Sequence, residues 1–276
     1  MIKVAVLGGK SFKEKADMFK WLKANEKAII LERKSQSKRK TLTNVLGFLD
    51  LETETIKGIP NMDADYIYPI ITNTNYKDSH KDVHLDGSMT KTAKEQDGKV
   101  YYLADHSLTM DGIIATPKNV DVMLETLTWK DLGRNYEGET EALIYKVKKD
   151  EIMHEKFLKL IEKGEPLQNS IRMQYVKIEF AFNSEDKEYV KEKKVWDEVS
   201  PKVVNLEGDD DDYFFAVKEL KLHLEGSAVL FGSNDSTPIK VTQAEKSLEE
   251  IEAEKSLREK EEQENLEKLF YNNINI

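Results

Sequence analysis

The side chains available for covalent or acid–base chemistry are few, because the 276-residue chain has no cysteine and five histidines. Without cysteine, a hydrolytic site needs a serine or threonine nucleophile, a pair of carboxylates or a metal ion. A nucleophilic serine also needs a base, which is a histidine unless a lysine serves. The five histidines are His80, His84, His106, His154 and His223.

His106 and Ser170 both lie at ends of predicted strands. Residues 99–103 (Lys-Val-Tyr-Tyr-Leu) predict a strand, and His106 follows where this strand leaves the sheet, a place that holds a base rigidly. Ser170 begins a long predicted strand over 170–182, on the face opposite Ile171, and is expected to be exposed at the edge of a barrel. Taken singly, such a serine or histidine is more often structural than catalytic.

The other histidines have weaker contexts. His80 and His84 are four residues apart, a spacing that binds zinc on a helix, but their segment does not have a helical pattern and no glutamate completes a hydrolase motif. A metal-dependent hydrolase is nevertheless an alternative. His154 is expected on the surface of a predicted helix over 150–164, which has Asp150 as N-cap and Gly164 at its end.

The strand and helix patterns of the segments around these side chains predict an α+β protein. The N-terminal part, to about residue 55, predicts a small α/β extension with strands at 2–7 and 28–31 around a helix with Phe12, Met18, Phe19 and Leu22 on one side. The apolar parity of the 170–182 strand switches after Tyr175, which predicts a bulge. Further strands are expected at 66–71, 141–147, 214–224 and 228–231. In the 214–224 strand, Leu220, Leu222 and Leu224 are expected on one face, with His223 and Glu225 on the other.

The charge distribution limits the partners. A net charge of −10 argues against broad nucleic-acid binding, although Lys34 to Lys40 form a local basic cluster. No stretch approaches the roughly 20 apolar residues of a membrane-spanning helix. The Gly8-Gly9-Lys10-Ser11 segment lacks the upstream glycine of a phosphate-binding loop, and the acidic run over 207–212 is expected to be a solvated loop rather than a calcium site.

The last segment differs in kind from the rest. Residues 243–270 contain no glycine or proline and carry ten acidic and five basic side chains. Their leucines and isoleucine fall near helical spacing, which predicts a charged amphipathic helix, a candidate for pairing with a partner or with a second copy of the chain.

Four stretches together resemble the prohead serine proteases of tailed bacteriophages, whose fold is similar to that of the herpesvirus capsid-maturation proteases. Residues 78–89 resemble the family's early segment, and 99–106 its strand ending in the catalytic histidine. Residues 150–171 resemble its helix, turn and nucleophile, and 222–231 a strand near the end of its fold. The order and spacing carry the resemblance, which covers about residues 60–240.

The resemblance implies a mainly antiparallel β-barrel with flanking helices over 56–242, between the 1–55 extension and the 243–276 helical tail. It implies Ser170 as nucleophile, His106 as general base and Glu225 as the third member, with His223 as competitor, since the herpesvirus relatives use a histidine there. Backbone N–H groups near Ser170 are expected in the oxyanion hole. It implies no cofactor or metal.

The resemblance also implies a place of action and partners. The expected function is a serine endopeptidase that cleaves scaffold and capsid proteins, and itself, inside the immature phage head in the host cytoplasm. Where the family commonly has a glycine two residues after the serine, this chain has Arg172, and its final turn is Gly232-Ser233-Asn234-Asp235. Arg172 is expected either to assist the oxyanion or substrate, or to mark an inactive capsid-assembly protein that keeps the fold.

Overall fold

The computed structural model describes residues 1–35, 62–206 and 212–241. The chain divides into two compact units, Met1–Val241 and Thr242–Ile276. The first is described below. The predicted tail helix, most of the basic cluster at 34–40, most of the acidic run at 207–212 and the predicted domain boundaries near 55 and 242 lie outside the described residues.

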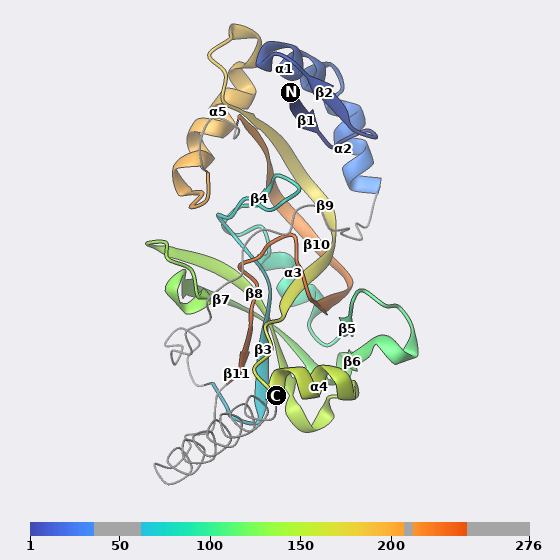
Figure 1. Ribbon diagram of the computed structural model, residues 1–276. Coiled ribbons are helices and arrows are strands. Elements are labelled where there is room, and N and C mark those ends of the chain that lie inside the picture. The colour runs from blue at the N-terminus through green and yellow to red at the C-terminus, as the bar shows by residue number, and fades with distance from the viewer. Residues whose placement is uncertain (36–61, 207–211, 242–276) are drawn as a thin grey trace, which may run out of the picture. The chain divides into compact units, whose positions relative to one another are not determined.

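The described residues form an α+β unit, which confirms the predicted class (Figure 1). The helices are α1 (Lys15–Ala24), α2 (Glu26–Ser35), α3 (Thr90–Gln96), α4 (Glu155–Glu162) and α5 (Val190–Val199). The strands are β1 (Ile2–Val4), β2 (Lys10–Phe12), β3 (Tyr66–Asn73), β4 (Asp82–His84), β5 (Tyr101–Ala104), β6 (Ile113–Ala115), β7 (Val120–Thr128), β8 (Glu139–Lys148), β9 (Gln168–Phe182), β10 (Tyr213–Val229) and β11 (Ile239–Val241).

The strands form a hairpin and two larger sheets. One sheet has the order β4-β10-β5-β6 with β9 also paired to β10, and the other has the order β11-β3-β8-β7. Within the described ranges most pairs are antiparallel, but β10 runs parallel to both β4 and β5, so the sheets are mixed. The closed barrel stays a prediction. No helix in these ranges is long and apolar enough to cross a membrane.

The β9–β10 ribbon is the longest feature of the unit, and it bends at two irregularities. The first irregularity lies where residues 175–178 of β9 pair with residues 217–220 of β10. It confirms the bulge that the parity switch in β9 predicts. The second lies opposite Arg172, between Leu222 and Gly226. There Leu224 adopts φ +68° and is 47% exposed, so the prediction that it shares the buried face of Leu222 is wrong.

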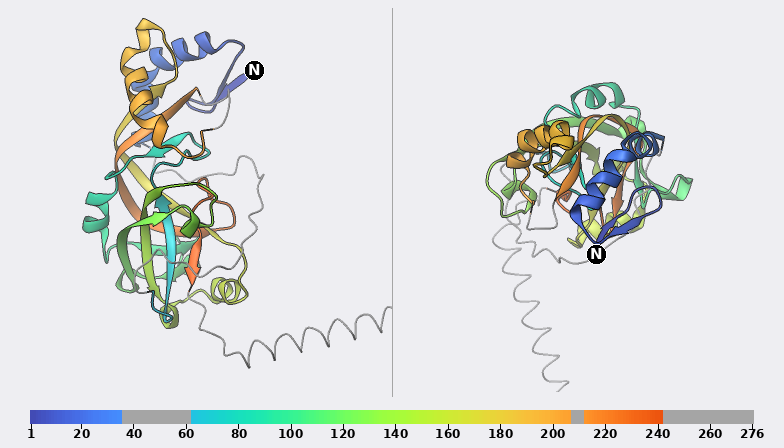
Figure 2. Two further views of the ribbon diagram at one scale, coloured as in Figure 1. Left: turned by 90° about the vertical axis from the view of Figure 1, so that its left-hand side faces the viewer. Right: turned by 90° about the horizontal axis from the view of Figure 1, so that it is seen from above.

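The N-terminal segment packs against the far end of this ribbon, where α1 lies beside α5 and α2 packs against β9 (Figures 1 and 2). The predicted strand at 28–31 is wrong, because these residues belong to α2, which buries Ile29 and Arg33 one turn apart. Arg33 pairs with Asp82 and stacks over the Phe215 ring, whose centroid is 3.5 Å away. Gly8 and Gly9 form the turn of the β1–β2 hairpin, so no helix follows them as a phosphate-binding loop would require.

The helix predicted over 150–164 is shorter than expected. Residues 149–151 form a 3₁₀ turn, and α4 begins at Glu155, with His154 rather than Asp150 as N-cap. His154 Nδ1 accepts the Phe157 N–H at 3.0 Å, which satisfies one of the free amides at the helix start. Gly164, at φ +70°, ends the helical segment as predicted.

Candidate active site

His106 is held by a tight turn at the end of β5. Asp105 and His106 both have positive φ angles, +52° and +56°, a conformation that is unfavourable for residues with a Cβ and is concentrated at functional sites. The turn is fixed to β10, since Asp105 N–H donates to the Ala228 carbonyl at 2.9 Å and His106 N–H donates to Ser227 Oγ at 3.2 Å. The backbone of the candidate base is therefore anchored, as predicted for a residue where a strand leaves the sheet.

Glu225 is the last residue of the second bulge of β10 and is fully buried. One carboxylate oxygen, Oε1, accepts from His106 Nδ1 at 2.8 Å and from Arg172 Nε at 2.9 Å. The other, Oε2, accepts from Ser227 Oγ at 2.5 Å. Because an ionised carboxylate only accepts, the proton of a neutral His106 ring lies on Nδ1, which leaves the Nε2 lone pair free to take a proton.

Ser170 lies on β9 directly opposite Ser227 of β10. Directly opposed residues of an antiparallel pair share a face, with Cβ atoms about 5 Å apart, so Ser170 and the His106 turn are both neighbours of Ser227. Ser170 is 4% exposed, so the prediction that its side chain is exposed is wrong. The segment before β11 covers the start of β9, through an isolated bridge between Gln168 and Pro238.

Asn169 fixes the backbone immediately before the candidate nucleophile. Its N–H donates to the Thr237 carbonyl at 2.9 Å, and Thr237 Oγ1 donates to the Asn169 carbonyl at 2.7 Å. The Tyr102 hydroxyl donates to Asn169 Oδ1 at 2.7 Å, and burial raises the pKa of this phenol, which keeps it a donor. Sequence reasoning missed Asn169, since its partners are 67 and 68 residues away along the chain.

Arg172 lies two residues after Ser170, on the same face of β9. It is buried, and its Nε bond to Glu225 makes it an ion-pair partner of the candidate triad carboxylate. Its Nη2 has no hydrogen-bond partner among the described residues. This arrangement is compatible with one expected role, a donor toward an oxyanion, and it adds a role that the sequence did not predict, the fixing of Glu225.

Three buried polar atoms gather at this place without hydrogen-bond partners in the described part of the chain: Ser170 Oγ, His106 Nε2 and Arg172 Nη2. Leaving a buried polar group unsatisfied costs about 1–3 kcal/mol each, and such groups concentrate at catalytic sites or mark an unseen partner. The hydrogen bond between Ser170 and His106 that would complete a triad is therefore absent from this state.

The competing histidines lie elsewhere or make other contacts. His106 Nδ1 is hydrogen-bonded to Glu225, while His223 is the first residue of the same bulge and is partly exposed. His84 is buried in β4, where its Nδ1 lies 3.0 Å from Thr72 Oγ1. The His80 carbonyl accepts from Arg33 Nη2 at 3.0 Å. Within the described residues, no group of three or more His, Asp or Glu side chains is placed to hold a metal ion.

Comparison with known proteins adds no relative to this description. The chain matches no protein-family model, no curated protein and no solved structure.

Proposed function

We propose that this protein is a serine endopeptidase of the phage prohead protease kind. The observation that carries the proposal is the buried 2.8 Å bond between His106 Nδ1 and Glu225 Oε1. Ser170 lies opposite Ser227, the residue whose hydroxyl binds the His106 backbone. A carboxylate that orients an imidazole, and leaves its Nε2 free next to a serine, is the arrangement that activates serine for acyl transfer.

In this mechanism Ser170 Oγ attacks the scissile carbonyl carbon while its proton moves to His106 Nε2. The carbonyl becomes a tetrahedral oxyanion, and Glu225 stabilises the imidazolium. His106 returns the proton to the leaving amine as the C–N bond breaks, which leaves an acyl-serine. Water, deprotonated by His106, then attacks this ester. As the ester C–O bond breaks, His106 returns the proton to Ser170 Oγ, which releases the carboxylic acid and regenerates the enzyme. Substrate must bring Ser170 within hydrogen-bond reach of His106, since such bonds often tighten only in the complex.

The proposed substrates are the scaffold and capsid proteins of the immature head, and the chain itself. Residues 243–276 are proposed to dock the protease to those proteins. A chain truncated after residue 242 should retain peptide cleavage but fail to enter proheads, and normal packaging of the truncated protein would rule out the docking role.

The function is tested by incubating the purified chain with its capsid precursor and mapping new termini by mass spectrometry. Cleavage is expected with wild type and absent with Ser170→Ala. The matched control is Ser107→Ala, which removes a partly exposed serine next to His106 that contacts Thr109 instead. Equal cleavage by wild type and Ser170→Ala would exclude Ser170 as nucleophile.

A second candidate is a capsid-assembly protein that keeps the protease architecture without turnover. Two observations favour it: Ser170 is buried, and the Arg172 guanidinium shares the carboxylate that would stabilise the imidazolium. This candidate predicts that wild type and Ser170→Ala leave the precursor intact and support head assembly equally well.

A further inference from the structure

A surface cleft lies between the 3₁₀ turn Met110–Gly112 with β6 and the start of α4. Its volume is about 580 Å³, within the range typical of ligand sites. Met110, Ile113 and Met153 supply its apolar lining, and His154 is also part of it. The charged groups are Asp111 on the loop wall and Glu155, Lys156 and Lys159 on the α4 wall. The cleft is therefore large enough for a substantial side chain and is bordered by polar groups that can orient a peptide.

The backbone connects this cleft to the candidate site. One wall belongs to the loop that begins at His106, and this loop is closed on itself, since a Cβ on Gly112 would lie 2.4 Å from the Ser107 carbonyl oxygen. The other wall is fixed to β6, because Met153 N–H donates to the Ile114 carbonyl at 2.9 Å. The loop that carries the proposed base therefore forms one wall of the cleft.

Exposed apolar side chains at the cleft and in the loop after His106 indicate an interaction surface. Met110 is 88% exposed and Met153 is 63% exposed, and Leu108 between His106 and Met110 is also exposed. Methionine adapts its shape to a bound apolar group, and clustered exposed apolar side chains indicate binding surfaces. Phe231, exposed just beyond β10, adds an aromatic ring where the chain turns past β9.

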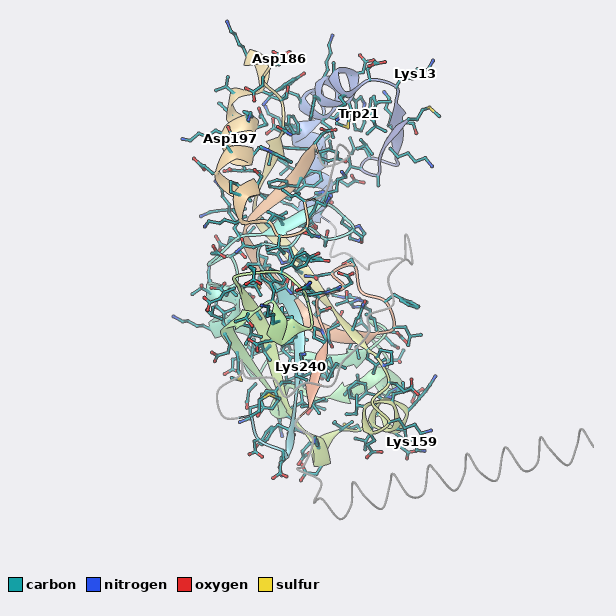
Figure 3. All side chains as sticks on the ribbon, turned by 60° about the vertical axis from the view of Figure 1, so that its left-hand side comes forward. Lys13, Trp21, Lys159, Asp186, Asp197 and Lys240 are labelled. Carbon is teal, nitrogen blue, oxygen red and sulfur yellow. The ribbon has the colours of Figure 1, made fainter. Side chains whose placement is uncertain are left out.

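The charges of the cleft indicate which peptide fits. Lys156 makes no ion pair within the described part of the chain, whereas Lys159, labelled on α4 in Figure 3, lies 4.0 Å from Glu155. Asp111 carries the opposite charge on the loop wall. An acidic residue of a bound peptide would therefore lie toward α4, beside Lys156, with its apolar neighbour against the methionines.

We propose that this cleft is the specificity subsite of the protease, and that it binds a flexible polypeptide segment with a large apolar residue next to an acidic one. This inference rests on the proposed function. Because Met110, Met153 and Lys156 are exposed, they can be changed with little effect on folding, which makes the subsite testable apart from the triad.

The test profiles cleavage of a peptide library by wild type, Met153→Glu and Lys156→Glu, with Val190→Glu, at an exposed position of α5, as matched control. Met153→Glu should lower kcat/KM for peptides with a large apolar residue by about 10-fold or more. Lys156→Glu should replace the preference for an acidic neighbour by one for a basic neighbour. Profiles identical to wild type in both variants would overturn the subsite and leave the protease function standing.

If wild type cleaves nothing, a binding experiment tests the cleft separately from the protease function. The probe is a short fluorescein-labelled Gly-Ser peptide containing one Leu-Asp pair, and fluorescence anisotropy is measured with Ser170→Ala. Saturable binding that is lost in Ser170→Ala/Met153→Glu, but kept in Ser170→Ala/Val190→Glu, supports the cleft without catalysis. Binding that Met153→Glu leaves unchanged places the peptide elsewhere and overturns the inference.

Discussion

Replacing Glu225 by glutamine removes the charge on which three side chains converge. His106 Nδ1, Arg172 Nε and Ser227 Oγ all donate to this fully buried carboxylate. The amide keeps one acceptor oxygen but offers an NH₂ group in place of the second, so one of the present donors loses its acceptor. Arg172 then loses the ion-pair partner that it has in the structure.

The expected loss of stability is large. Breaking a buried ion pair by removing one partner costs about 3–5 kcal/mol, since the remaining charge stays buried. For a unit of this size each kcal/mol lowers Tm by roughly 2–4 °C, so Glu225→Gln should lower Tm by roughly 6–20 °C. Activity should fall by about 10⁴, the effect of neutralising the carboxylate of a Ser-His-Asp triad, because the imidazole is no longer held in the correct tautomer.

The assay is urea unfolding followed by circular dichroism, with peptide cleavage measured in parallel on the folded variant. The control is Glu219→Gln on the same strand, whose contacts with Lys91 and Lys177 are near the surface and should contribute less than about 1 kcal/mol. Adding Arg172→Met to Glu225→Gln removes the stranded cation and should restore most of the stability but not the activity.

A loss below about 1 kcal/mol in Glu225→Gln would refute the reasoning, since it would mean that Arg172 and Glu225 do not form a buried pair. Recovery of activity in the double variant would also refute it, because the carboxylate would then have no role in orienting His106.

Three further predictions concern stability. Burial, partly offset by Asp131, lowers the pKa of Lys240 (labelled in Figure 3) from 10.5 to about 8. The unfolded chain therefore binds more protons between these pH values, and the free energy of unfolding should rise with pH from about 8 to 10. Lys240→Met should abolish that rise and stabilise the folded protein at pH 7 by up to about 3 kcal/mol, whereas Lys118→Met on the surface should do neither. Arg33→Met should destabilise by about 3–5 kcal/mol in urea titrations, because Asp82 loses its buried partner, while Lys34→Met should change little. Leu224→Gly should raise the free energy of unfolding by about 1 kcal/mol, because glycine adopts φ +68° without strain and the side chain that is lost is half exposed. A lower free energy of unfolding in this variant would argue against the bulge.

The sequence predicted those elements whose pattern is local and long. The alternation over β9 located both the strand and its first bulge, because a parity switch is visible in the order of residues. The second bulge was missed, since Leu220, Leu222 and Leu224 continue one alternation without a break. Only the pairing of β10 with β9 places three residues opposite Arg172 and buries Glu225.

Tertiary contacts decided the other differences. The Ala28 to Leu31 run is equally compatible with a strand or a buried helix segment, and the pairing of Arg33 with Asp82, 49 residues away, is invisible to a local pattern. His106 and Glu225 were paired in the sequence through the family resemblance, not through spacing. The family resemblance assigns no role to Asn169, and the hydrogen bonds that make it important connect it to residues far along the chain.

The central claim, that Ser170 is a nucleophile activated by His106, is tested most directly by labelling with a fluorophosphonate and mapping the adduct by mass spectrometry. We expect one adduct, on Ser170, that is lost in Ser170→Ala, forms much more slowly in His106→Ala and is retained in Ser107→Ala. Absence of any adduct on the folded wild-type protein, or an adduct on another serine, would contradict it.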